Sequence, residues 1–67
     1  MSSAQVAKSQ KLVCNWHILA AKRGIAMAQF YLSSYYGKGK CVPKNSDKAV
    51  KWLALAAKQG NASAQYN

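Results

Sequence analysis

The chain has 67 residues, enough for one small domain, and its ten lysines and arginines against a single acid give a formal charge of +9. With 51% apolar residues, two tryptophans and four tyrosines, the composition excludes an intrinsically disordered chain. No apolar run approaches the roughly 20 residues that span a bilayer, and no apolar block of a secretory signal follows the first twelve residues. We expect a soluble, cytoplasmic protein, with secretion by a signal-independent route left open.

The first predicted helix covers residues 5–22 and closes at Gly24. Lys22 and Arg23 lie in its last turn, where positive charge complements the negative end of the helix dipole, and glycine commonly follows a helix end. Its predicted inward line is Val13, Trp16, His17 and Ala20. A tryptophan is therefore expected in the core.

A second helix is predicted over residues 25–36, followed by a loop that contains Gly37, Gly39 and Pro43. Ser33 is small enough to let a neighbouring helix approach closely. The predicted inward line of this helix is Ala28, Leu32 and Tyr36.

The third predicted helix begins where Asn45 or Ser46 supplies a capping oxygen, and Asp47 lies in its first turn, where negative charge is favourable. We expect Gly60 to end it, and residues 61–67 to begin a fourth helix. Its inward stripe, at helical spacing, is Ala49, Trp52, Leu53 and Ala56. Truncation of a buried Trp52 ring to alanine is expected to cost about 3–5 kcal/mol.

The chain contains an internal repeat, because the fifteen residues 16–30 recur thirty-six positions later as residues 52–66. A fixed period of this size is typical of stacked helical repeats, in which each unit buries its apolar face against the next. Two antiparallel helices per period are the expected unit. Trp16 and Trp52 are then predicted to occupy equivalent positions and similar environments in an all-α fold.

The pattern A-x-A-Q-x-x-L, Y-x-x-G-x-x-V, K-A-x-x-W-x-x-x-A-A-x-x-G resembles the Sel1-like repeat, a relative of the tetratricopeptide repeat. The residues that carry it are Ala26, Ala28, Gln29, Leu32, Tyr36, Gly39, Val42, Lys48, Ala49, Trp52, Ala56, Ala57 and Gly60. The resemblance implies a short right-handed α-solenoid whose members act as adaptors between proteins and perform no chemistry. Within one domain, residues 1–67, it implies the second helix of a preceding repeat (5–24), a full repeat (25–60) and the start of a following one (61–67).

This sequence departs from the family pattern at three positions. Ser33 and Cys41 stand where members often have glycine, and Asn45 replaces a more usual aspartate but keeps a capping oxygen. If Cys41 must take the conformation that glycine normally takes, its loop is strained or rearranged.

Cys14 and Cys41 are the only cysteines, and with His17 they make three candidate ligands, fewer than the four of a structural zinc site. We expect no metal and no cofactor. A disulfide is compatible with the sequence, but two free thiols in a reducing compartment are favoured. The paired cysteines of the cysteine-rich branch of the resembled family are not matched here.

Catalysis is not expected, because one carboxylate, one histidine and two cysteines outside any CxxC pair provide no acid–base pair and no activated nucleophile. His17 is interpreted as a packed or partly exposed side chain. We predict a non-catalytic module for protein–protein interaction.

Two surfaces are candidates for binding. The first is the inner face of the solenoid, lined by the first helix of each repeat, where tyrosines offer large contact areas; the residues expected to point away from the packed line of the second predicted helix are Gln29, Tyr31, Tyr35 and Lys38. Packing against a neighbouring repeat is an equal interpretation of the two tyrosines.

The second surface is basic and would bind an anionic partner such as nucleic acid, an acidic membrane surface or an acidic protein. Its residues on the third helix are Lys44, Lys48, Lys51 and Lys58, which would merge with Lys8, Lys11 and Lys22 of the first helix if the two helices stack. A simply solvated charged face is the alternative.

A stack of this kind generally needs about three units, so apolar ends should be left uncovered. We expect either a piece of a longer solenoid or a protein that covers its ends as a homodimer or domain-swapped form.

Overall fold

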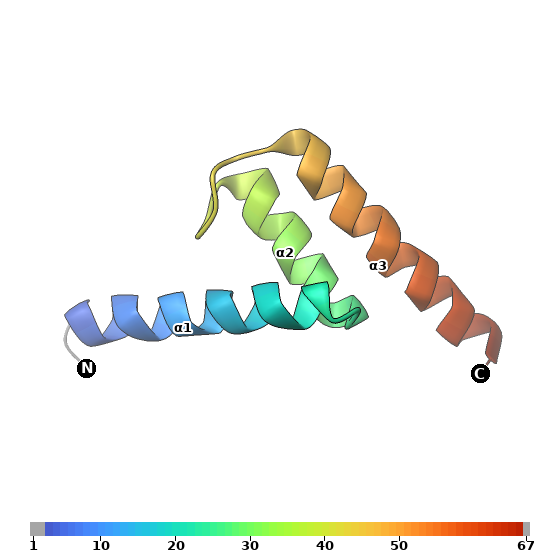
Figure 1. Ribbon diagram of the computed structural model, residues 1–67, viewed down its shortest axis with the longest axis horizontal. Coiled ribbons are helices and arrows are strands. Elements are labelled where there is room, and N and C mark those ends of the chain that lie inside the picture. The colour runs from blue at the N-terminus through green and yellow to red at the C-terminus, as the bar shows by residue number, and fades with distance from the viewer. Residues whose placement is uncertain (1–2, 67) are drawn as a thin grey trace.

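The computed structural model describes residues 3–66, which form three helices and, over that range, no strand. They are α1 (Ser3–Lys22), α2 (Ala26–Lys38) and α3 (Ser46–Tyr66). Figure 1 shows α2 and α3 side by side and antiparallel, with α1 crossing α2 on its other side. Over the described range no Cα atoms of α1 and α3 come within 8 Å of each other, and α2 lies between them in a body of 45 × 25 × 16 Å. The predicted all-α fold is confirmed.

The end of α1 is closed by Gly24, as predicted. Gly24 has a φ of +93°, a left-handed conformation that costs glycine little. Its N–H donates to the carbonyl of Ala21 at 3.0 Å, and the N–H of Ile25 donates to the carbonyl of Ala20 at 3.1 Å. These two bonds satisfy the last carbonyls of the helix and turn the chain directly into α2.

Helix α2 extends two residues beyond its predicted end, because Gly37 stays helical. Gly37 faces α3, since a Cβ atom there would lie 3.9 Å from the Cβ of Ala49, at an ordinary van der Waals distance. Ser33, one turn earlier, also faces α3, and its hydroxyl donates to the carbonyl of Ala49 at 2.7 Å. Gly39, with a φ of +71°, then ends the helix.

The loop between α2 and α3 contains the strained residue that the sequence predicts. Cys41 has a φ of +66°, in the left-handed region that costs a non-glycine residue roughly 1–2 kcal/mol. The loop ends at Asn45, whose side-chain oxygen accepts the N–H of Lys48 at 3.0 Å. Asn45 is therefore the residue that caps α3.

The predicted end of α3 at Gly60 is wrong, since the helix continues through Gly60 to Tyr66. Gly60 lacks the positive φ of Gly24. One helical glycine costs only about 1 kcal/mol relative to alanine, less than the backbone hydrogen bonds that a break would remove. The predicted fourth helix, 61–67, is instead a continuation of α3 as far as Tyr66, and Asn67 lies outside the described residues.

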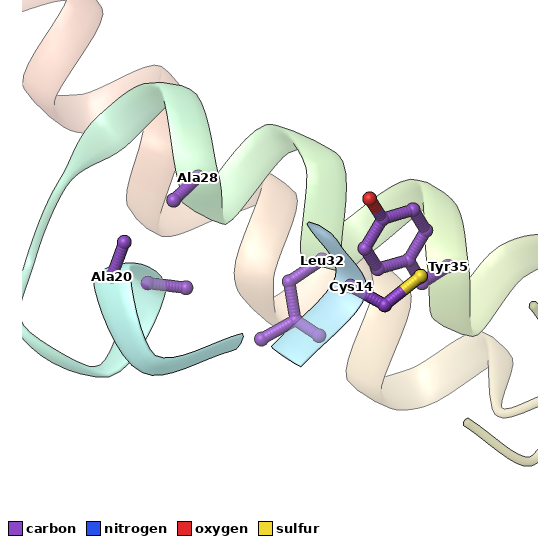
Figure 2. Packing of buried hydrophobic residues seen from close by; sticks show 6 residues of the cluster. Cys14, Ala20, Ala28, Leu32 and Tyr35 are labelled. Carbon is purple, nitrogen blue, oxygen red and sulfur yellow. The ribbon is translucent and has the colours of Figure 1, made fainter. Parts of the chain in front are cut away.

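The core is built from small side chains around α2, and Figure 2 shows Leu32 and Tyr35 of α2 projecting on the side of Cys14. The buried apolar residues are Cys14, Ala20, Ala21, Ala28, Leu32, Tyr35 and Ala56. The predicted core residues Tyr36, Ala49 and Trp52 are half-buried. Close approach of helix backbones, rather than bulky side chains, therefore holds this domain together.

Trp16 is the main error in the predicted core, because 65% of its surface is exposed. Val13 and Leu53, also expected to point inward, are 51% and 45% exposed. Helix α1 contributes the buried Cys14 and Ala21 and the half-buried Ile18 to the core around α2. Trp16 on α1 corresponds in the repeat to Trp52 on α3, which faces α2. No described helix precedes α1 that could cover Trp16 in the same way.

Candidate functional site

Four ring side chains meet where α1 crosses α2. The His17 ring stacks on Tyr31 with centroids 4.3 Å apart and an interplanar angle of 20°. The Trp16 ring meets His17 edge-on, with centroids 5.3 Å apart, and the Nδ1 atom of His17 lies 2.7 Å from the Tyr35 hydroxyl. This aromatic cluster runs from an exposed ring on α1, across a half-buried histidine, to an exposed ring on α2.

Tyr35 is the buried member of that cluster, with 7% of its surface exposed. Burial, and to a smaller extent the neighbouring Tyr31, raises the pKa of its phenol above the ordinary value. The hydroxyl therefore keeps its proton in the folded protein and holds α1 against α2 through His17.

Two of the residues predicted to point away from the packed line of α2 are themselves buried. Gln29 is 4% exposed, and its side chain donates to the carbonyl of Ala21 at 3.3 Å and accepts from Gln59 at 2.9 Å. Tyr35 is buried against α1. Because α2 has a helix on each of two sides, half of the positions expected to be free are occupied by packing. Tyr31 and Lys38 are exposed, as expected.

Met27 and Phe30 were not predicted as binding residues, but with Tyr31 and the small Ser34 they form a largely apolar stripe at positions i, i+3, i+4 and i+7. Met27 is 70% exposed, Phe30 48% and Tyr31 46%. These four residues, the α2 surface, line an open pocket of about 380 Å³. The spacing could have been read from the sequence, since the stripe lies opposite the predicted inward line.

A second apolar surface lies on α1, around Trp16. Leu12 and Leu19, one turn to either side of it, are 62% and 61% exposed. The far end of this stripe opens into a pocket of about 220 Å³, whose lining residues are Trp16, Leu19, Ala20, Arg23 and Ile25. We call Leu12, Val13, Trp16 and Leu19 the α1 face.

The four lysines of the predicted basic surface, Lys44, Lys48, Lys51 and Lys58, are all exposed. Lys48 and Lys51 border a pocket of about 390 Å³ that also contains Tyr36 and Trp52, and the Lys48 Nζ atom lies 5.4 Å from the centre of the Tyr36 ring. The expected merging with the lysines of α1 is wrong, because α1 and α3 are not stacked on each other.

Cys14 and Cys41 form a disulfide, so the favoured prediction of free thiols is wrong. Their Cα atoms lie 6.3 Å apart, although 27 positions separate them in the sequence. The left-handed turn at Cys41 lies in the bonded loop. The fold brings the middle of α1 beside the α2–α3 loop, a proximity that spacing in the sequence alone does not reveal.

Among the described residues no group of three or more histidine, cysteine or acidic side chains is arranged to hold a metal ion. No helix in the described part of the chain combines the length and apolar character that a membrane crossing requires.

The family model described as Sel1 repeat matches residues 26–61, more than half of the 67 residues. Comparison with curated proteins and with solved structures gives no match. Sel1 repeats are helical, related to the tetratricopeptide repeat, and are generally protein-interaction modules. With α2 and the first part of α3 as the paired helices of one repeat, the chain belongs to the Sel1 repeat family.

Proposed function

We propose that this chain is a non-catalytic module that binds another protein through the α2 surface. The observation that carries the proposal is the stripe of Met27, Phe30 and Tyr31, three large apolar side chains exposed on one helix. Grouped apolar side chains on a charged protein are typical of interaction sites, and aromatic residues supply much of the binding energy in such interfaces.

The position of the titratable groups supports a role without catalysis. Asp47 lies at the start of α3 and His17 on α1, and no Cα atoms of these two helices come within 8 Å of each other over the described residues. His17 is also engaged with Tyr31 and Tyr35, and both cysteines are joined in the disulfide. A general acid and base need to lie within reach of one substrate, and these groups do not.

The test is affinity capture with paired variants of the whole chain. Met27→Ser with Phe30→Ser removes two side chains of the α2 surface, and Val50→Ser with Leu55→Ser removes two exposed apolar side chains of α3 as a matched control. We expect at least one protein to be retained by the wild type and the α3 control but lost by the α2 variant. Identical retention by all three, or no retained protein, would contradict the proposal.

A second candidate function is binding of an anionic partner at Lys44, Lys48, Lys51 and Lys58. The observation that favours it is the pocket in which Lys48 and Lys51 lie beside Tyr36 and Trp52. Cationic side chains next to aromatic rings suit single-stranded nucleic acids, whose bases stack on the rings while lysines contact phosphates.

Fluorescence anisotropy of a labelled single-stranded oligonucleotide tests this candidate. Binding should weaken steeply as salt is raised and should fall when Lys48 and Lys51 are changed to glutamine. The matched control changes Lys8 and Lys11 on α1, which keeps the same net charge. Absence of binding at low salt, or equal loss with both pairs, excludes a specific site on α3.

Two further expectations stay predictions. The division of the chain into parts of three repeats, at residues 5–24, 25–60 and 61–67, is one. The cytoplasmic location is the other, and the Cys14–Cys41 disulfide instead supports an oxidising compartment. Alkylation of free thiols in intact cells, followed by mass measurement, distinguishes the two locations.

A further inference from the structure

We propose that the α1 face is a docking site for an acidic amphipathic helix of a partner protein, which would take on α1 the place that α2 takes on α3. The inference rests on the proposed function, since it requires a protein partner, but it names a different surface and the chemistry of its occupant.

The internal repeat is the first reason to propose a docking site on α1. Val13, Trp16 and Ala20 correspond, thirty-six positions later, to Ala49, Trp52 and Ala56. Helix α2 covers that later set: Ala56 is fully buried and Trp52 packs against the core. The Ser33 hydroxyl also bonds the carbonyl of Ala49. Of the matched positions on α1, Val13 and Trp16 are exposed whereas Ala20 is buried in the core, so the place that α2 takes on α3 is open on α1 at Val13 and Trp16.

The exposed apolar side chains of the α1 face are the second reason to propose a docking site there. Trp16, Leu12 and Leu19 each leave more than 60% of their surface uncovered. They lie at positions i, i+4 and i+7, and so form one straight stripe along α1. The pocket of about 220 Å³ at the end of the stripe has Ala20 among its lining residues and is wide enough for an apolar side chain from a partner. A helix with its own apolar line fits such a stripe.

The positive charges around the α1 face indicate that its occupant is acidic. By helical periodicity Lys8 lies on the stripe at one end, and Lys11 and Lys22 lie along one edge. Arg23, in the turn after α1, lines the pocket at the other end. The one acid of the chain, Asp47, lies on α3, away from this face. A helix with acidic residues beside its apolar line would pair with these cations, over a span of about 22 Å or fifteen residues. A second copy of this chain would instead bring another charge of +9.

The probe is a synthetic peptide with the α2 sequence, residues 25–38, in which the outward positions carry Met27→Glu, Phe30→Glu, Ser34→Glu and Lys38→Glu. These four positions are exposed on α2, whereas Gln29 and Ser33, which bond α3, are kept. A matched peptide carries lysine at positions 27, 30 and 34 and keeps Lys38. Binding to the whole chain is followed by the emission of Trp16 in a Trp52→Phe background, and by anisotropy of labelled peptide.

The acidic peptide is expected to shift the Trp16 emission to shorter wavelength and to bind at least tenfold more tightly than the basic peptide. Trp16→Ala should weaken its binding about tenfold or more, while Val50→Ala, at an equally exposed position of α3, should leave it unchanged. Equal binding of both peptides, or no effect of Trp16→Ala with the fold intact by circular dichroism, would overturn the proposal.

Two outcomes separate this proposal from its alternatives. Sedimentation at the assay concentration should show a monomer, and a dimer that Trp16→Ala dissociates would assign the face to a second copy and overturn the acidic helix. If the Met27→Ser, Phe30→Ser variant loses its captured protein while the acidic peptide fails to bind, the proposed function stands and this inference fails.

Discussion

At the scale of single residues, Tyr35 connects α1 to α2 through both its ring and its hydroxyl. The ring belongs to the core, and the hydroxyl lies 2.7 Å from His17. A hydrogen bond of this kind contributes about 0.5–1.5 kcal/mol. The pKa of the phenol is raised by burial, so the folded state binds this proton more tightly than the unfolded state.

Tyr35→Phe should therefore lower the free energy of unfolding by about 1 kcal/mol at neutral pH. This advantage of the wild type is constant well below the ordinary tyrosine pKa of about 10 and shrinks as pH rises through that value toward the raised pKa of the native state. Urea unfolding of both proteins between pH 7 and 11 measures it. Tyr31→Phe, at an exposed ring, is the control, and an advantage that persists unchanged at pH 11 would contradict the assignment.

The burial of Ala20, Ala28 and Leu32 could be predicted from the sequence, whereas the burial of Gln29 and Tyr35 could not. The helical period alone places Ala20, Ala28 and Leu32 inside, as the structure has them. Gln29 and Tyr35 lie next to that predicted line, and their burial depends on α1 and α3 packing on two sides of α2. A period identifies one face of a helix, whereas the number of covered faces follows from the tertiary arrangement.

At the scale of the elements, the two repeated glycines behave differently. Gly24 has a left-handed backbone and turns the chain, whereas Gly60 lies within a continuous helix. The turn at Gly24 is accompanied by packing of α2 against α1. The sequence predicts the same role for both because the residues before them, Ala-Ala-Lys, are the same.

Alanine substitution distinguishes these two conformations. Gly24→Ala should destabilise the protein by about 1 kcal/mol, because alanine is strained at a φ of +93°. Gly60→Ala should stabilise it by up to about 1 kcal/mol, because alanine favours the helix and no other atom lies within 4 Å of the new Cβ. Thermal unfolding measures both, and destabilisation by Gly60→Ala would restore the predicted turn at that residue.

The α2–α3 loop is attached to α1 by the disulfide, which closes a loop with a sequence separation of 27. A covalent loop of that length stabilises a fold by about 3–4 kcal/mol in the chain-entropy estimate. Changing both cysteines to serine should lower the unfolding free energy by that order and increase hydrogen exchange in α1 more than in α3. Intact mass before and after alkylation is the control, and stability that does not respond to reduction would contradict the bond.

At the scale of the whole molecule, the two copies of the repeat are equivalent in sequence but not in environment. Trp52 packs between α3 and the core, while Trp16 is 65% exposed on α1. The prediction of similar environments is therefore wrong, although both rings occupy the same place on a helix that follows the same pattern. The pattern specifies where a partner helix would bind, and among the described helices α2 occupies only one of the two sites.

The decisive measurement is acrylamide quenching of tryptophan fluorescence in the single-tryptophan variants Trp16→Phe and Trp52→Phe. Acrylamide is neutral, so the charge of +9 does not bias its access. We predict that Trp16, observed in Trp52→Phe, is quenched about as strongly as free tryptophan, and that Trp52, observed in Trp16→Phe, is quenched severalfold less. Equal quenching of the two rings would contradict an uncovered α1 face and the docking site proposed on it.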